Sequence, residues 1–537
     1  MDSKRPILSN KIYLYLTEFF AGMSVMAVEL DASRLLAPYF SSSQIVWTII
    51  IGTIMIAMAL GNIYGGRSAD KNPNPDRLYA RIIVAAIWIA LIPVVGKYLI
   101  VGISALLIFT VNNNFLIIAG FVTCMVIFVF PLFLLGTVTP SLVKYTMDSL
   151  NDSGRTVGNL NAFNTIGSII GTFVPTFISI PTVGTAITFL VFAGILLALS
   201  LIYFLTSHIA LKKMKKVPVS VVIFLVCCIF GHNDSFAFWD KDLTYEGESI
   251  YNYLQVYEND YEIALSTNVL FGVQSVYEKE RHLTGAYYDY AMAAPMMAGL
   301  MEKESIDALV LGMGTGTFAT QCGRYFEGIH FTGVEIDQKI TDLAHRYFHL
   351  SEDIPVITYD GRAYLNVIDK KYDVIMVDAY QDITIPFQMS SVEFFTLVKD
   401  HLRDDGVMVV NFNMRGSGSV SINEYLSDTI ASVFPEVRII EPSGTNSILY
   451  AMKTDSMMDT FNRNVALVSD PELITLFGEI RNDSFVYHGG KHIMTDDKAP
   501  VELLGMKVID SMIRDEVSYY KDIYRKEGLK GLIEALR

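Results

Sequence analysis

Cysteine is scarce in this chain, which has four in 537 residues. Cys124, Cys227 and Cys228 lie within long apolar runs, and Cys322 is alone in the second half of the sequence. A single cysteine cannot form a disulfide within its own domain, and these positions lack the spacing of a metal-binding motif. We therefore expect no intradomain disulfide in the second half and no metal centre.

Basic residues are also few. The chain has 41 Lys and Arg against 56 Asp and Glu, which gives a net charge of −15. A nucleic-acid-binding surface needs clustered positive charge, because it must neutralise backbone phosphates. The composition therefore argues against a nucleic-acid partner.

Apolar residues, in contrast, are abundant before residue 232, and they raise the mean hydropathy of the whole chain to +0.38. Apolar runs of about 20 residues, long enough to cross a bilayer, recur there between short polar loops. They predict an N-terminal all-α polytopic membrane domain over residues 1–231, in a multi-pass protein of the cell membrane. The expected spans, about seven in number, are Tyr13–Leu36, Val46–Tyr64, Ile82–Val101, Phe115–Leu135, Leu160–Ile180, Ala186–Thr206 and Val217–Phe230.

Charge in the loops between these runs predicts the topology. Basic residues cluster at the N-terminus and in alternate loops (67–81, 144–155 and 212–216), so the positive-inside rule places the N-terminus in the cytoplasm. An odd number of spans would then place the second half of the chain outside. If the short run Val217–Phe230 only lies in the interface, or if Tyr98–Val111 also spans, the second half lies inside. The sequence leaves both topologies open.

Ionisable residues on or just after the first apolar run have two interpretations. Glu18, Glu29, Asp31 and Arg34 lie there, at a depth where charge is costly unless it is paired or used. They form either a polar substrate or proton site, or an interfacial ion cluster that orients the helix.

The second half has ordinary soluble composition, and its pattern alternates between strands and helices. This alternation predicts a Rossmann-like, largely parallel sheet covered on both faces over residues 301–537. Residues 232–300 contain two alternating runs, Tyr253–Val256 and Val269–Tyr277, and read as a small β-region. The expected strands of the main sheet are Ala308–Leu311, His330–Glu335, Val356–Tyr359, Val374–Val377, Val407–Phe412, Val437–Ile440 and Ser447–Met452. The expected helices are Thr317–Tyr325, Gln338–Phe348, Val392–Leu402 and Ile422–Phe434.

A glycine loop follows the first of these strands. Glycines let the backbone approach a ligand closely, and the next helix offers unpaired N–H groups at its N-terminus. Glu335 ends the next strand about 20 residues downstream, where an acid can accept both ribose hydroxyls. Loop and acid together predict a nucleoside-cofactor site. The loop residues concerned are Gly312, Gly314, Thr315 and Gly316.

Acidic residues fall at successive strand ends, where ligands bind in such sheets. Asp337 follows Glu335, Asp360 precedes Gly361 after the third strand, and Asp378 ends the fourth. Asp360 is placed to accept from an adenine amino group. Asp378 would face the reactive end of the cofactor, where a carboxylate can take a proton from an amine nucleophile. Asp382, one loop further along, either holds a cationic substrate or caps its loop.

These segments resemble the polyamine aminopropyltransferases (spermidine synthases), and the apolar half resembles the membrane-fused branch of that family. The resemblance implies transfer of an aminopropyl group from decarboxylated S-adenosylmethionine to an amine such as putrescine, with no tightly bound cofactor and as a homodimer. It implies that Glu335 binds ribose, Asp360 adenine and Gln274 the cofactor, and that Asp378 activates the amine. The run Tyr287, Tyr288 and Asp289 would contact the substrate. The matching segments are Gln274, Tyr287–Asp289, Gly312–Gly316, Val334–Asp337, Asp360–Gly361, Asp378, Glu393–Phe395, Thr495–Glu502 and Glu29–Pro38.

The chain departs from the family pattern at the residues that select cofactor and acceptor. Thr315 stands where the family has the aspartate that binds the aminopropyl ammonium group, and a neutral hydroxyl cannot make that charge-assisted contact. A methyltransferase or another sulfonium-consuming enzyme, using unmodified S-adenosylmethionine, therefore stays an alternative. A second alternative, motivated by the acids in the first apolar run, is a transporter or sensor whose soluble half binds a nucleoside or polyamine.

Overall fold

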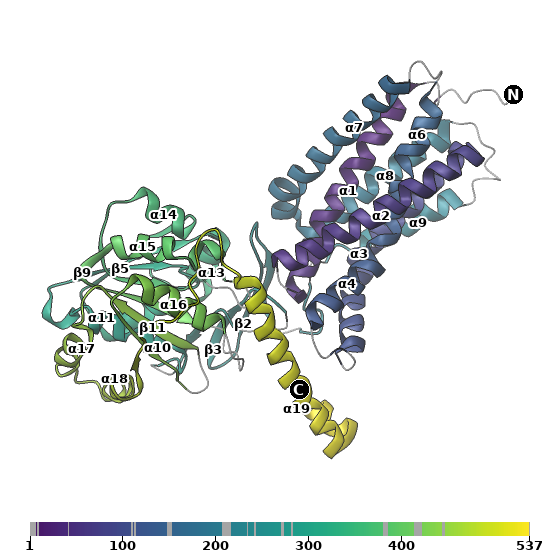
Figure 1. Ribbon diagram of the computed structural model, residues 1–537. Helices are drawn as coiled ribbons and strands as arrows, with labels where there is room; N and C mark the ends of the chain where they lie inside the picture. The colour runs from purple at the N-terminus through teal and green to yellow at the C-terminus, as the bar shows by residue number, and fades with distance from the viewer. Residues whose placement is uncertain are drawn as a thin grey trace. The chain divides into compact units, whose positions relative to one another are not determined.

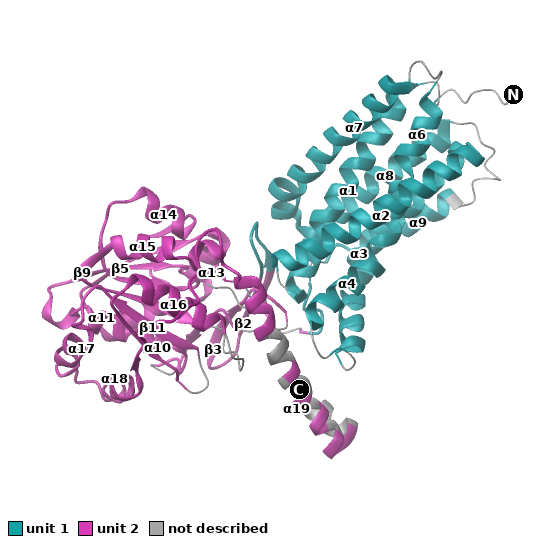
Figure 2. Ribbon diagram, viewed as in Figure 1, with its two compact units in different colours: residues 1–239, 247–253 teal, residues 240–246, 254–537 magenta. Residues whose placement is uncertain are grey.

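The chain divides into two compact units, residues 1–239 with 247–253 and residues 240–246 with 254–537 (Figure 2). We refer to them as the helical unit and the α/β unit. The computed structural model describes residues 7, 10–40, 42–108, 111, 114–147, 153–206, 216–233, 235–240, 243–269, 273–280, 283–379, 385–412, 421–442 and 446–535.

The helical unit is a bundle of long apolar helices (Figure 1). Its helices are α1 (Lys11–Phe40), α2 (Gln44–Lys71), α3 (Pro75–Leu107), α4 (Phe115–Ile127), α5 (Val129–Gly136), α6 (Val138–Thr146), α7 (Ser153–Val174), α8 (Ile180–Thr206) and α9 (Lys216–Phe230), with a π-helical turn at Pro175–Ser179. Five helical stretches among the described residues are long and apolar enough to cross a membrane. They are Lys11–Phe40, Gln44–Lys71, Pro75–Leu107, Val129–Thr146 and Ser153–Thr206, and Phe115–Ile127 and Val217–Phe230 are shorter apolar helices.

Two details differ from the expected spans. The stretch Tyr98–Val111 is no separate element, because α3 continues without a break to Leu107 although Pro93 lies within it. The run Phe115–Leu135 is not one helix. It is interrupted at Phe128, and a further interruption at Thr137 precedes α6, which the sequence pattern missed because only nine residues form it.

Helices α1 and α7 pack at unusually short range through glycines. A Cβ atom on Gly167 would lie 2.0 Å from Phe19 O, and one on Gly171 would lie 2.1 Å from Met23 O. Any larger residue would therefore force the two backbones apart. This is the helix-packing role that the spacing of these two glycines indicates.

One acidic residue of α1 is enclosed by its neighbours in the bundle. Glu18 is fully buried, and its Oε1 atom accepts hydrogen bonds from Thr139 Oγ1 in α6 at 2.6 Å and from Asn164 Nδ2 in α7 at 2.7 Å. Glu18 therefore links three helices, while its Oε2 atom is buried without a hydrogen-bond partner among the described residues.

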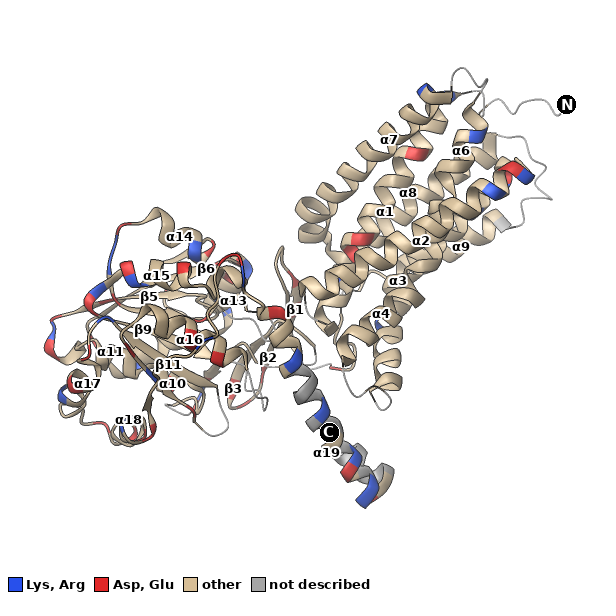
Figure 3. Ribbon diagram, in the orientation of Figure 1, with Lys and Arg blue, Asp and Glu red and all other residues tan. Residues whose placement is uncertain are grey.

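The described Lys and Arg residues of the helical unit gather mainly at one end of the bundle (Figure 3). Lys144 pairs with Asp70 there at 3.0 Å. The segment that follows α9 contacts the opposite end: Lys97 Nζ donates to Ser235 O at 2.7 Å, and Tyr39 Oη donates to Phe236 O at 2.8 Å. The chain therefore leaves the bundle at the end away from its basic loops.

The α/β unit is built on an eight-stranded sheet with the order β12-β10-β11-β9-β8-β5-β6-β7. Neighbours from β7 to β9 are parallel, whereas β11 pairs antiparallel with β9 and with β10. The expected, largely parallel Rossmann-like sheet is thus confirmed, with an antiparallel edge added. Its strands are β5 (Ile306–Leu311), β6 (Ile329–Glu335), β7 (Val356–Thr358), β8 (Tyr372–Val377), β9 (Leu402–Phe412), β10 (Glu436–Ile440), β11 (Ser447–Met452) and β12 (Phe485–Val486).

Helices cover both faces of this sheet (Figure 1). One face carries a core of fully buried side chains that includes Met292, Met296 and Phe461. The sequence pattern missed several of these helices, among them α14, whose seven residues are too few for a clear periodicity. The helices of the α/β unit are α10 (Tyr287–Ala291), α11 (Ala293–Met297), α12 (Thr317–Tyr325), α13 (Gln338–Tyr347), α14 (Gly361–Val367), α15 (Val392–Asp400), α16 (Ile422–Val433), α17 (Met457–Val465), α18 (Pro471–Asp483) and α19 (Val501–Ala535), of which α19 does not cover the sheet.

A separate four-stranded sheet precedes the main one, with the order β1-β2-β3-β4. Its strands are β1 (Leu243–Glu248), β2 (Tyr253–Glu258), β3 (Glu262–Ser266) and β4 (Ser275–Glu278). Side chains of β2 and β3, such as Leu254 and Leu265, pack on α13 through Leu343 and Phe348. Strand β4 is thereby held beside the glycine loop, where Thr317 Oγ1 donates to Val276 O at 2.8 Å.

Candidate active site

The carboxyl group of Asp378 lies directly after β8, at the carboxyl edge of the parallel strands. Its backbone N–H donates to Leu311 O, the last residue of β5, at 2.9 Å. Tyr287 Oη donates to Asp378 Oδ2 at 2.7 Å, and Asn411 Nδ2 donates to Oδ1 at 2.8 Å. Donors from α10 and β9 thus hold one oxygen each and fix the orientation of this carboxyl group.

The surroundings of Asp378 also set its protonation. Burial raises the pKa of Asp378 to about 7, and the neighbouring charge of Glu335 adds to the rise. The hydrogen bonds from Tyr287 and Asn411 act in the opposite direction, because they stabilise the ionised form. A carboxyl group with a pKa near neutrality can accept a proton and release it again, which is the property needed in a general base.

Asn411 and Asn446 are site residues that the sequence analysis missed. Asn446 Nδ2 donates to Asn411 Oδ1 at 3.0 Å, so the amide nitrogen of Asn411 is left to face Asp378. Asn411 pairs with Ile448 of β11 across the antiparallel edge, which brings Asn446 beside it. The only signal in the sequence was a polar residue near the end of an otherwise apolar strand.

The glycine loop and Glu335 meet as the sequence predicts. Glu335 Oε2 accepts from Gly314 N at 2.9 Å, and Oε1 accepts from Asp337 N at 3.1 Å. Burial raises the pKa of Glu335, although these backbone N–H groups oppose the rise. Gly312 has φ of +83°, and a Cβ atom there would lie 2.6 Å from Ala379 Cα. The loop therefore lies against the residue that follows Asp378.

Asp337 and Asp360 both cap helices. Asp337 Oδ1 accepts from Lys339 N at 3.1 Å at the start of α13, and Asp360 Oδ1 accepts from Ala363 N at 2.7 Å at the start of α14. Asp337 is buried, so its contacts favour a structural role beside Glu335. Asp360 is only partly buried and lies at the same edge of the sheet, after β7.

The three residues Tyr287, Tyr288 and Asp289 have two different environments: the tyrosines lie beside Asp378 and Gln274, and Asp289 contacts the turn before α10. The rings of Tyr287 and Tyr288 lie with centroids 3.9 Å apart, and Tyr288 Oη donates to Gln274 O at 2.8 Å. Gln274 is thereby held near Asp378 through the tyrosine pair. Asp289 instead accepts from Thr284 N, Thr284 Oγ1, Gly285 N and Gln321 Nε2, at 2.7 to 3.2 Å. These contacts organise the turn before α10 and favour a structural role over the expected contact with substrate.

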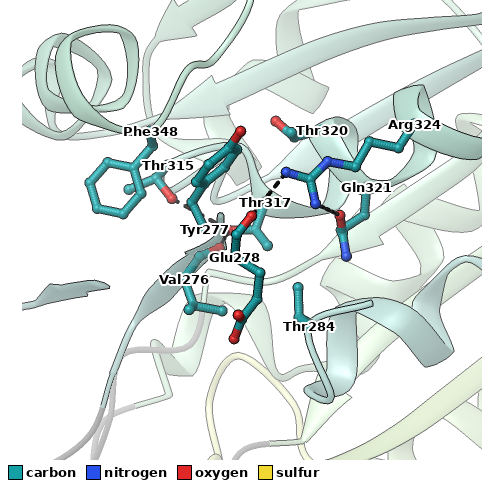
Figure 4. A pocket seen from close by; sticks show the side chains of 10 residues that line it. All are labelled: Val276, Tyr277, Glu278, Thr284, Thr315, Thr317, Thr320, Gln321, Arg324 and Phe348. Atoms are coloured by element: carbon teal, nitrogen blue, oxygen red, sulfur yellow. Dashed lines mark hydrogen bonds between the residues drawn. The ribbon is translucent and has the colours of Figure 1, made fainter. Parts of the chain in front are cut away.

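Thr315 lies inside the glycine loop but takes no part in the contacts of Asp378 or Glu335 described above. Its side chain is buried and lines a small pocket between β4 and α12, with Thr317, Thr320 and Gln321 (Figure 4). Its Oγ1 atom lies 3.4 Å from Thr317 Oγ1, and its N–H donates to Ser275 Oγ at 3.3 Å. The position is thus occupied by a neutral group that contacts other hydroxyls. Asp382 lies outside the described residues.

Comparison with known proteins identifies the family. Residues 288–453 match the spermine/spermidine synthase domain. The chain is 49% identical over 358 residues to a probable polyamine aminopropyl transferase of Bifidobacterium longum, and the match covers 63% of this chain and 79% of that protein. The chain belongs to the polyamine aminopropyltransferase family. It is therefore a transferase, and the resemblance found in its sequence is confirmed.

Other relatives of this chain are more distant. A polyamine aminopropyltransferase of Vibrio vulnificus is 26% identical, over 48% of this chain and 85% of its own length. An N-terminal histidine N-methyltransferase of Emericella nidulans is 31% identical, over 29% of both chains. Among solved structures, spermidine synthase from Thermotoga maritima matches 44% of this chain and 87% of its own, with 17% identity and a TM-score of 0.34.

Proposed function

We propose that this family member is a membrane-bound enzyme that transfers an aminopropyl group from decarboxylated S-adenosylmethionine to an amine such as putrescine. The observation that carries the proposal is the geometry of Asp378. Its carboxyl group has a pKa near 7 and is held by Tyr287 and Asn411. The backbone of Asp378 and Ala379 lies against the glycine loop of a nucleoside-type site.

In the proposed reaction, the neutral amine nitrogen attacks the carbon next to the sulfonium sulfur. The new N–C bond forms as the C–S bond breaks, and neutral methylthioadenosine leaves with the bonding electrons. The amine must lose a proton, and the ionised Asp378 carboxylate accepts it. Tyr287 and Asn411 keep the carboxylate oriented during this step.

The cofactor would lie across the carboxyl edge of the sheet. Glu335 is proposed to bind the ribose hydroxyls, Asp360 the adenine and Gln274 the tail that bears the sulfonium. The ends of β6 and β7 and the segment before β4 provide these groups. Tyr287 and Tyr288 are proposed to contact the amine, whereas Asp289 is assigned to the turn before α10.

Location in a bilayer is proposed from the helical unit. Five stretches have the length and composition of membrane spans, and basic residues gather at one end of the bundle. By the positive-inside rule that end, with the N-terminus, faces the cytoplasm.

The test incubates purified protein with putrescine and either form of the cofactor, and identifies the products by mass spectrometry. We expect methylthioadenosine and spermidine from the decarboxylated form. Asp378→Asn should reduce the rate about 100-fold or more, because general bases contribute factors of this size. Undiminished turnover in this variant would refute the assigned mechanism.

Methyl transfer from unmodified S-adenosylmethionine is the second candidate. Thr315 favours it, because a neutral side chain in the glycine loop offers no charge partner for an aminopropyl ammonium group. The same incubation separates the two reactions, since methyl transfer yields S-adenosylhomocysteine and not methylthioadenosine.

A further inference from the structure

The segment Met494–Lys498, far along the chain from the proposed site, reaches the residue next to the adenine-binding turn. Asp496 Oδ1 and Oδ2 accept from the two terminal nitrogens of Arg362 at 2.7 and 2.6 Å. Arg362 lies two residues after Asp360, in the first turn of α14. This is a two-pronged, charge-assisted pair, the geometry in which a guanidinium group is held most rigidly.

Asp496 is itself fixed on the opposite side. Ser391 Oγ donates to Asp496 Oδ1 at 2.6 Å, and Asp496 N donates to Glu393 Oε2 at 3.1 Å. Val392 N also donates to Met494 O at 2.9 Å. The segment is therefore anchored to the N-terminus of α15. This helix packs beside the main sheet and supports the Asp496 carboxylate that holds Arg362.

Arg362 makes a third link, to the short 3₁₀ turn η6 (Phe387–Met389). Its Nη1 atom donates to Gln388 O at 2.9 Å. A Cβ atom added to Gly361 would lie 3.4 Å from Met389 Cε and 3.6 Å from Leu311 Cβ. The turn Asp360–Gly361 is thus packed between the end of β5 and η6, and Arg362 fixes η6 in that place.

We propose that Asp496 is a positioning residue, which acts through Arg362 to fix the Asp360–Gly361 turn where the nucleoside part of the cofactor binds. The inference rests on the proposed function, because it takes Asp360 as an adenine ligand. Asp496 has no part in the chemical step. Its loss should weaken cofactor binding and raise the KM for cofactor more than it lowers kcat.

The experiment measures the binding of methylthioadenosine by calorimetry, together with KM and kcat, in the full-length protein. We expect Asp496→Asn to weaken binding about fivefold to tenfold, in keeping with a partly exposed two-pronged pair that supports other contacts. Asp496→Glu keeps the charge and should recover part of the loss. Asp497→Asn is the matched control, because it removes the same charge from the same exposed turn outside these contacts, and it should change binding less than twofold.

A substitution of Arg362 tests the same pair independently if the Asp496→Asn variant fails to fold. Arg362→Lys keeps the charge but loses the two-pronged geometry, so it should weaken binding in the same direction. Arg362→Gln is measured alone and together with Asp496→Asn. Because the two residues act as one unit, the double variant should bind no more weakly than the more impaired of the two single variants. The pH at which kcat is half-maximal should stay unchanged in all of them, since it belongs to Asp378.

The outcomes distinguish the two proposals. If the unsubstituted protein binds no methylthioadenosine, the proposed function is wrong. If it binds, but Asp496→Asn and Asp497→Asn behave alike, or if the effects of Asp496→Asn and Arg362→Gln add, the positioning role is wrong. A loss of kcat with an unchanged KM for cofactor would also overturn it.

Discussion

At the scale of single residues, the protonation of Asp378 links structure to chemistry. Burial disfavours the charged form of the carboxyl group, and the two hydrogen bonds that hold it recover only part of that cost. The result is a base with a pKa near neutrality, strong enough to accept a proton from an amine as the new bond forms. An exposed aspartate, with a pKa near 4, would be a weaker base.

The first prediction concerns the pH dependence of transfer. Only the ionised form of Asp378 can accept a proton, so the rate should rise with pH and reach half its maximum near pH 7. Below that point it should fall about tenfold per pH unit. Transfer rates measured at saturating acceptor and cofactor between pH 5 and 9 provide the check. A rate that is flat down to pH 5 would exclude the raised pKa.

Tyr287 gives a second, more local prediction. Its hydroxyl stabilises the ionised carboxylate, so Tyr287→Phe should raise the pKa of Asp378 further. The midpoint of the pH profile should move to higher pH by about half a unit to one unit, the size of one hydrogen bond to a charged group after partial compensation. Tyr288→Phe is the control, because that hydroxyl donates to the Gln274 carbonyl. A shift to lower pH in Tyr287→Phe would contradict the assignment.

At the scale of elements, the glycine loop packs against the residues that directly follow β8. Gly312 combines a positive φ with a close approach to Ala379, so the loop and the residue after Asp378 are packed backbone to backbone. The same loop reaches Glu335 through Gly314 N. Two elements, the β5–α12 loop and the end of β8, therefore set the distance between the proposed ribose ligand and the proposed base.

Substituting Gly312 by alanine tests this arrangement. The added Cβ would lie 2.6 Å from Ala379 Cα, on a backbone with φ of +83°. We expect a loss of about 1–3 kcal/mol in unfolding free energy, together with a large loss of transfer rate. Thermal unfolding and the transfer assay measure both.

Gly323 supplies the control for that substitution, since it lies within α12 and a Cβ there meets nothing within 4 Å. Gly323→Ala should leave activity unchanged and stabilise the unit by up to about 1 kcal/mol, because alanine is the better helix former. Equal losses in the two variants would mean that the backbone contact at Gly312 is unimportant.

At the scale of the whole molecule, the distribution of basic residues in the helical unit predicts its orientation in a membrane. Most of its described Lys and Arg residues lie at one end, and residues 235 and 236 contact the other end through Lys97 and Tyr39. If the bundle spans a bilayer, this arrangement predicts an odd number of crossings between α1 and residue 233. The positive-inside rule then predicts that residue 233 lies outside the cytoplasm.

Cysteine labelling in intact cells tests this topology. The single cysteine of the α/β unit, Cys322, is fully buried and cannot report it, so cysteines are introduced at exposed positions. An impermeant maleimide should label Asn233→Cys in intact cells and Asn72→Cys only after the cells are opened, with the unsubstituted protein as background. Protection of Asn233→Cys in intact cells would contradict the odd number of crossings and would favour a cytoplasmic catalytic unit.

The sequence by itself determined the class of this protein and the positions of Glu335, Asp360 and Asp378. Apolar run length, strand–helix alternation and a glycine loop are local patterns, and each depends on residues within a few turns of one another. Strands β5 to β11 and helices α12, α13, α15 and α16 were predicted from such patterns to within a few residues, except that β9 begins earlier, at Leu402. Strand β12 and helices α17, α18 and α19 were not predicted. Short or interrupted helices, such as α6 and α14, were missed because few residues carry their periodicity.

Only the tertiary structure decided which side chains surround Asp378. Tyr287 lies 91 positions away in the sequence and Asn411 33 positions away, and neither distance implies a contact. Strand order brings Asn411 to Asp378, because β9 lies beside β8. Helix α10 contacts β9 and β11 and brings Tyr287 to the same place. The same long-range packing placed Asp496 against Arg362. Such contacts depend on how segments that are distant in the sequence pack against one another, and local sequence patterns do not contain this information.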